Sequence, residues 1–382
     1  MTFKQISWTA VLLLSTATAA TTQEVTLDAP GTDDSLLSLL QDASLSRSVG
    51  DEDDPQPQDY VAAARADYRR LLTALYAAGY YSGTISIKVN GTEAANLAPL
   101  DAPSQIDVIA IAVDPGPIYT FGTASVAPLA PGTELPKAFA PGEDAKADAI
   151  RQASRNARTA WRDQGYAKVE ASGQQIVARH NDNLLDASVT IAPGPRLTFG
   201  PLTVTGNYKV RTSAITRIAG LPTGEVYDPE DLNQVARRLR ETGAFDSVAL
   251  TEADDIGPND TLPITVAIAE SKPRRIGVGL EYSTVEGIRT SAYWLHRNFF
   301  GGAENLRFDA AVAGIGGGTG GVDYSLSTAL KIPAIYGADT DLTATAEISR
   351  EDEPDYLIDS ASTEVLVSRL VTNNLDIEGA DR

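Results

Sequence analysis

The residues that could carry chemistry are few and lie far apart in this sequence. There is no Cys, so disulfides, thiolate metal sites and Cys nucleophiles are excluded. The two His, His180 and His296, each lack the nearby carboxylate and nucleophile that a catalytic triad needs. Residues 316–321 match Gly-x-Gly-x-x-Gly, but a dinucleotide site requires a strand before this pattern and a helix after it. An alternating segment follows instead, so we expect a hairpin connection there. The sequence predicts no enzyme, no cofactor and no metal site.

Acidic residues dominate the charge. The chain has 382 residues, with 31 Lys+Arg against 51 Asp+Glu and a net charge of −20, so it lacks the cationic surplus that nucleic-acid binding needs. The acidic run 51–54 does not have the ligand spacing of a calcium loop, so a cation would be held there only weakly, and contact of 351–355 with a divalent ion is a minor alternative. We expect 51–58 to be a solvated loop between helices and 351–355 to be a loop between strands.

The first twenty residues have the pattern of a secretory signal peptide. Lys4 supplies a positive charge, 6–14 form a short apolar stretch, and Ala17-Thr18-Ala19 offers a small-x-small cleavage site. No later segment has the ~18 consecutive apolar residues of a transmembrane helix. The sequence therefore predicts an exported protein, cleaved near Ala19 or Ala20.

A repeat runs through the first two-thirds of the chain. The pattern Pro-Gly-Pro-x-[Tyr/Leu]-Thr-Phe-Gly occurs at 115–122 and again at 193–200, and 269–277 occupies the equivalent place with a different sequence. Each unit also contains a helical stretch that ends in Gly and is followed closely by an aromatic residue, at Gly79, Gly165 and Gly243. We expect three β-α-α-β-β units, at 24–115, 119–195 and 197–272.

The third unit has the strongest local signals. Asp228 is a good N-cap and Pro229 suits the first helical position, so a helix is predicted from there to Glu241. A shorter helix is predicted at 211–219, ending at Gly220. Strands are predicted at 197–205, 244–250 and 262–269, the last with Leu262, Ile264, Val266 and Ile268 facing inward. In the second unit we expect the long helix at 147–164.

Residues 274–382 alternate between apolar and polar or small side chains, which predicts β-strands. The predicted strands are 276–282, 290–296, 306–312, 322–332, 342–348 and 363–371. This period of two is typical both of an outer-membrane barrel and of a soluble β-sandwich. The export signal and the acidic, Cys-free composition favour the barrel. Six strands are too few to close one, so we expect an incomplete transmembrane antiparallel barrel at 274–382, belonging to a fragment or a truncated gene.

Three such units followed by amphipathic strands resemble the outer-membrane assembly proteins that combine POTRA domains with a surface-antigen barrel. The most specific stretch is 297–306, Arg-Asn-Phe-Phe-Gly-Gly-Ala-Glu-Asn-Leu, which alone predicts a turn at Gly301-Gly302 between two strands. The count of three repeats is most similar to TamA-like subunits of the translocation and assembly module. A loop motif that this family carries late in its barrel is absent here.

The resemblance implies a protein of the outer membrane with its N-terminal domains in the periplasm. It implies autotransporter-type clients, contact with outer-membrane lipid, and a TamB-like partner anchored in the inner membrane. It also implies a weak seam at the first barrel strand, which here comprises Ile276, Gly277, Val278, Gly279, Leu280, Glu281 and Tyr282. Its two glycines either weaken the strand so that it opens or ease a tight corner. The rival interpretation is a soluble periplasmic binding or adhesion module with a C-terminal sandwich.

Overall fold

The computed structural model describes residues 24–51, 55–318, 320–372 and 375–381. The predicted signal peptide at 1–20 and part of the acidic run at 51–58 lie outside these residues. The described residues form two compact units: one comprises those within 24–128, 134–156 and 171–190, and the other those within 129–133, 157–170 and 191–381. No helix within the described ranges combines the length and the apolar character needed to cross a membrane.

The first repeat has the predicted element order, with one small extra strand. Its sheet runs β1-β4-β2-β3, with β1 parallel to β4 and β2 antiparallel to it. Asp67, buried on α2, accepts hydrogen bonds from Ser44 Oγ (2.7 Å) and from two backbone N–H groups, and so fixes the turn after α1. The elements are β1 Glu24–Asp28, α1 Asp34–Ala43, α2 Pro57–Ala78, β2 Thr84–Val89, β3 Thr92–Glu93 and β4 Val108–Asp114, with short 3₁₀ turns η1 Val49–Asp51, η2 Ala94–Asn96 and η3 Pro99–Asp101.

The second repeat contains one helix where two were expected. Its elements are β5 Thr120–Ala127, α3 Ala147–Arg162, β6 Glu170–Arg179 and β7 Leu184–Ala192, and the sheet order is β5-β7-β6. The segment 128–146, where the first helix was expected, contains no α-helix. It holds Pro128, Pro131, Pro136 and Pro141, and proline removes a helical hydrogen bond and clashes with the preceding turn.

The third repeat confirms its sequence-based elements to within a residue or two. They are β8 Thr198–Thr205, α4 Thr212–Ala219, α5 Pro229–Glu241, β9 Phe245–Glu252, the short η4 Pro258–Asp260 and β10 Thr261–Glu270. The sheet order is β8-β10-β9, with β8 parallel to β10. Asp228 caps α5 by accepting from Glu230 N (2.8 Å), and Gly220 ends α4 in the left-handed conformation. The four inward residues predicted for β10 are all buried.

The repeated sequence pattern builds the same backbone junction twice. Gly79 and Gly165 both have positive φ, +97° and +95°, just after a helix. The carbonyl of Gly79 accepts from Tyr119 N at 2.9 Å, and the carbonyl of Gly165 accepts from Leu197 N at 2.9 Å. Each start of a new repeat is therefore tied to the helix end of the repeat before it.

Different side chains support these two junctions. At the first, Tyr81 stacks on Tyr76 with ring centroids 5.0 Å apart and donates to Ala145 O at 2.8 Å; burial raises the pKa of Tyr81 to about 12. At the second, Arg162 donates to Glu252 at 2.5 Å and lies over the ring of Tyr227.

Tyr227 also donates to Glu252, at 2.7 Å. Burial, reinforced by that bond to Glu252, raises the pKa of Tyr227.

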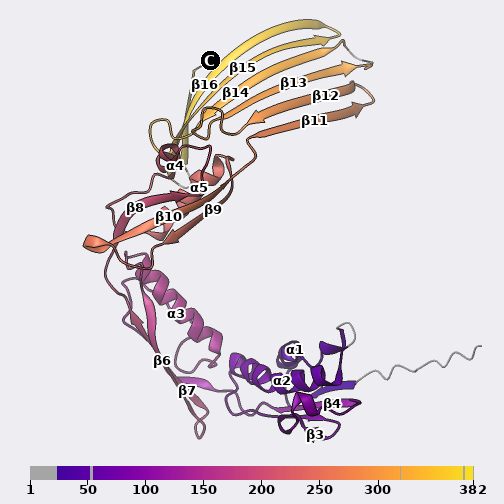
Figure 1. Cartoon of the computed structure of the whole chain (residues 1–382), viewed down its shortest axis with the longest axis vertical. Helices are drawn as coiled ribbons and strands as arrows, with labels where there is room; N and C mark the ends of the chain where they lie inside the picture. Colours follow the sequence, from indigo (N-terminus) through magenta and orange to yellow (C-terminus); the bar gives the residue numbers. More distant parts are fainter. Residues whose placement is uncertain (1–23, 52–54, 319, 373–374, 382) are drawn as a thin grey trace, which may run out of the picture. The chain divides into compact units, whose positions relative to one another are not determined.

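The strands beyond Arg274 form one antiparallel sheet in chain order, β11 to β17 (Figure 1). The two packed sheets of a sandwich are not present among the described residues. The strands are β11 Arg274–Ser283, β12 Gly287–His296, β13 Asn305–Ile315, β14 Asp323–Ile332, β15 Thr340–Glu353, β16 Tyr356–Thr372 and β17 Leu375–Asp381.

Seven strands are thus described where six were predicted. The acidic segment 351–355 is a loop only at 354–355, because β15 continues to Glu353 and pairs with Tyr356. The glycine-rich segment connects β13 to β14, as expected.

Candidate functional site

The register of the sheet separates two chemically different faces. One row across the strands consists of Val278, Ala292, Ala310, Leu326, Ile348 and Ala361. The adjacent row, on the opposite face, consists of Gly279, Ser291, Ala311, Ser325, Ser349 and Ser360. On the apolar face Leu326 is 50% exposed and Ile348 56%. An apolar surface this broad needs a cover, either a bilayer or another protein.

All seven residues of the predicted seam lie in β11, an edge of the sheet. Four of them, Ile276, Val278, Leu280 and Tyr282, point to the apolar face and are between 73% and 85% exposed. Within the described residues β11 pairs only with β12, so its other side presents backbone donors and acceptors to any incoming strand.

The glycines of β11 make room for side chains of β12. A Cβ on Gly277 would overlap the ring of Tyr293, and one on Gly279 would come 2.6 Å from Ser291 Oγ. The guanidinium of Arg307 lies 4.4 Å from the centroid of the Tyr293 ring and is held by Asp309 through two hydrogen bonds of 2.6 and 2.7 Å. The two glycines therefore have a packing role, which neither of the alternatives drawn from the sequence included.

The motif at 297–306 forms a folded loop and not the tight Gly-Gly turn that was predicted. β12 ends at His296 and β13 begins at Asn305, so eight residues connect them. The buried Glu304 accepts from Phe300 N (3.1 Å) and Gly302 N (2.8 Å), and Asn298 accepts from Ala303 N (2.9 Å). The polar residues of the motif were the sequence signal for such a loop, because their side chains accept hydrogen bonds from its backbone N–H groups.

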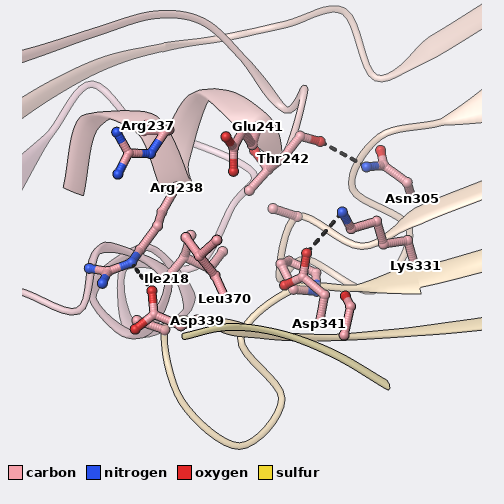
Figure 2. Close-up of a pocket in the computed structure, with 14 residues that line it drawn as sticks. Ile218, Arg237, Arg238, Glu241, Thr242, Asn305, Lys331, Asp339, Asp341 and Leu370 are labelled. Atoms are coloured by element: carbon pink, nitrogen blue, oxygen red, sulfur yellow. Dashed lines mark hydrogen bonds and ion pairs between the residues drawn. The ribbon is translucent and has the colours of Figure 1, made fainter. Parts of the chain in front are cut away.

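A pocket of about 350 Å³ is lined jointly by the third repeat and the base of the sheet, and sequence reasoning missed it (Figure 2). Arg238 on α5 donates to Asp339 at 2.6 Å, and Asn305 Nδ2 donates to Thr242 O at 2.8 Å. Inside the pocket Lys331 pairs with Asp341 at 2.8 Å. The Arg238–Asp339 and Asn305–Thr242 contacts join residues 101 and 63 positions apart, which no local pattern indicates.

Apolar packing supports the same junction. Ala303 and Ala334, from loops of the sheet, are fully buried in the hydrophobic core of the third repeat. Gly220 at the end of α4 faces Ala338 so closely that an added Cβ would overlap it. The third repeat and the sheet base therefore form one packed body. No group of three or more metal-binding side chains is found within the described ranges.

Comparison with known proteins gives the chain a family context. Residues 197–271 match the POTRA family model, described as a surface antigen variable number repeat. BamA from Haemophilus ducreyi lacking POTRA domains 1–3 superposes with a TM-score of 0.50 at 14% identity, over 65% of this chain and 47% of that one. The match takes in less than half of that BamA chain, and at this identity it shows a shared fold.

Two further structures align less closely. BamA POTRA3–5 from Haemophilus influenzae has a TM-score of 0.44 at 18% identity, covering 65% of this chain and 95% of that one. CdiB from Acinetobacter baumannii has a TM-score of 0.38 at 11% identity, covering 68% and 51%. The expectation of POTRA-like domains is confirmed for 197–271 by the family match, and the Haemophilus ducreyi structure supports a shared fold.

Proposed function

We propose that this chain belongs to an outer-membrane assembly and translocation factor of the TamA-like kind. In this proposal, 1–20 is a signal peptide, 24–115, 119–195 and 197–272 are periplasmic POTRA-like domains, and 274–382 is the first part of a barrel. The barrel lies in the outer membrane and the protein performs no enzymatic reaction. The POTRA match at 197–271 and the BamA-like fold support this assignment.

The edge strand β11 is the observation that carries the proposal. Its backbone is unpaired on one side within the described sheet, and its apolar side chains form an exposed row beside it. A client strand can add to such an edge through main-chain hydrogen bonds, which tolerate many side-chain sequences. The client's own apolar residues then continue the lipid-facing surface of the sheet.

Backbone pairing also supplies the driving force for insertion. In hydrocarbon each unsatisfied N–H or C=O costs several kcal/mol, so a client strand gains most by pairing before it meets lipid. The clients are autotransporter-type outer-membrane strands, first received on the edges of the periplasmic sheets. A TamB-like partner anchored in the inner membrane delivers them from the periplasmic side.

Photo-crosslinking from two matched tyrosines tests the proposal. Tyr282 on the edge strand β11 and Tyr324 on the interior strand β14 both lie on the apolar face, 75% and 51% exposed. Two variants of the native protein, each with benzoylphenylalanine at one of these positions, are co-expressed with a stalled autotransporter client. We expect client adducts from position 282 and none from 324. Equal adducts at both positions, or none at 282, would refute a client-binding edge.

A further inference from the structure

A groove lined by cations lies where the third repeat passes into the sheet. It has a volume of about 700 Å³ and is formed by the loop after β8, the connection from β10 to β11, and the loop after β12. Its lining includes the cations Lys209, Lys272 and Arg274 beside the ring of His296, and no Asp or Glu is among the lining residues. Such a concentration of cations is unexpected in a chain whose net charge is −20.

The carboxylate of Glu270, next to Lys209, is engaged by the backbone. Glu270 Oε1 accepts from the N–H groups of Tyr208, Lys209 and Val210 at 2.8 to 2.9 Å. Within the part of the chain that the structure describes, no ion pair involves Lys209, Lys272 or Arg274. These three side chains are also exposed, and their ammonium and guanidinium groups are therefore available to an external anion.

Exposed aromatic rings surround the groove. Phe299 lines it, Phe300 follows, and Tyr208 lies next to Lys209, whose ammonium is 5.5 Å from the centroid of the Tyr208 ring. The rings are 43%, 58% and 66% exposed. Aromatic residues beside cations are typical of the layer between hydrocarbon and water.

The groove also lies at the start of the apolar face. Arg274 is the first residue of β11, and Ile276 begins the exposed apolar row two positions later, a distance of about 7 Å along a strand. An anion held by Arg274 would thus be adjacent to an apolar surface. A phospholipid has this combination of a charged headgroup and apolar chains, whereas free phosphate has only the charge.

We propose that this groove binds the phosphate of an anionic phospholipid in the periplasmic leaflet, with Lys209, Lys272 and Arg274 as ligands. The proposal depends on the placement of β11 to β17 in the outer membrane. A bound headgroup would fix the height of the third repeat at the membrane surface, directly below the edge strand.

Lipid retention measures this binding. The whole chain in neutral maltoside micelles is loaded with phosphatidylglycerol or phosphatidylcholine, washed, and assayed for lipid retained per chain. Each cation near an anionic surface strengthens binding by about fivefold, so we expect K209Q/K272Q/R274Q to lower phosphatidylglycerol affinity by about a hundredfold at low salt. The variant K209R/K272R/R274K keeps the charge and should keep the affinity.

The matched control is K88Q/K137Q/R158Q, which removes the same charge from exposed positions elsewhere. It should leave retention unchanged. An equal loss in both triple variants, equal retention of the two lipids, or displacement of phosphatidylglycerol by millimolar inorganic phosphate would overturn the proposal. A chain that requires detergent to stay dispersed but shows no preference for phosphatidylglycerol would refute the groove alone and leave the membrane placement intact.

Discussion

Arg238 on α5 and Asp339 in the connection from β14 to β15 are 101 positions apart, yet Nε of the first lies 2.6 Å from Oδ1 of the second. Arg238 also donates to Ala219 O at 3.0 Å, so a single guanidinium bridges α5, the end of α4 and the sheet base. Its side chain is only 14% exposed, which reduces screening by water. The third repeat is therefore held to the sheet by a specific ion pair as well as by apolar packing.

A double-mutant cycle measures what this pair contributes. We expect R238Q and D339N to show a coupling free energy of about 1 kcal/mol in urea unfolding, because the pair is short and partly buried. Arg151 and Asp148, 3.5 Å apart and both more than half exposed, provide the control cycle, for which we expect almost no coupling. The same coupling in both cycles would show that the interdomain pair has no special role.

Substitution of Gly220 should lower stability for two reasons, its positive φ and its close approach to Ala338. Gly220→Ala places a methyl group at positive φ and against Ala338, and we expect a loss of about 2–3 kcal/mol in unfolding free energy. Gly224→Ala has the same backbone problem at φ +90° but nothing within 4 Å, so it should cost less. Equal losses would mean that the approach of Ala338 does not constrain the junction.

Gly277 should matter because of the ring of Tyr293. Gly277→Ala is expected to destabilise the sheet by about 1–3 kcal/mol through overlap with that ring, and adding Tyr293→Ala should recover part of the loss. Gly318→Ala, in a connection with open space around it, should have little effect. Unfolding in detergent gives the three free energies. If Gly277→Ala is as harmless as Gly318→Ala, the proposed packing is wrong.

Tyr81 predicts a specific alkaline sensitivity. Its pKa is raised from 10.0 to about 12 by burial first and then by Tyr76, so the folded state favours the neutral phenol. That stabilisation is fully present below pH 10 and is lost as the pH rises from 10 to about 12. Wild type should therefore lose stability relative to Tyr81→Phe across this interval, as measured by unfolding at a series of pH values. A constant difference between the two proteins would contradict the shift.

Features set by a few neighbouring residues were predictable from the sequence. The cap at Asp228 and Pro229, the helix end at Gly220 and the alternation of β10 all depend on local chemistry, and the structure has each of them. The prediction of two helices in the second repeat was wrong, because it gave the analogy between repeats more weight than the prolines of 128–146. Strand β17 gave no usable pattern, and it is absent from the predictions.

Features that depend on the fold as a whole were not predictable. The Arg238–Asp339 pair, the groove at Lys209 and Arg274, and the ring of Tyr293 over Gly277 each join residues from separate elements. No spacing rule connects such residues, because the sheet register and the packing of α5 decide which of them meet. Glu304 stands out as a polar residue of the motif, but the sequence does not show which backbone N–H groups it accepts from, because the loop conformation decides that.

The central claim is that one face of the sheet meets lipid and the other meets water. Because the chain has no Cys, Leu326→Cys and Ser327→Cys each create a unique thiol on opposite faces of β14. Each variant is reconstituted in proteoliposomes. When the thiol carries a fluorophore, brominated lipid should quench the label at 326 strongly and the label at 327 weakly. When the thiol is left unlabelled, a water-soluble maleimide should react readily at 327 and not at 326. Equal quenching and equal reaction at the two positions would contradict the account.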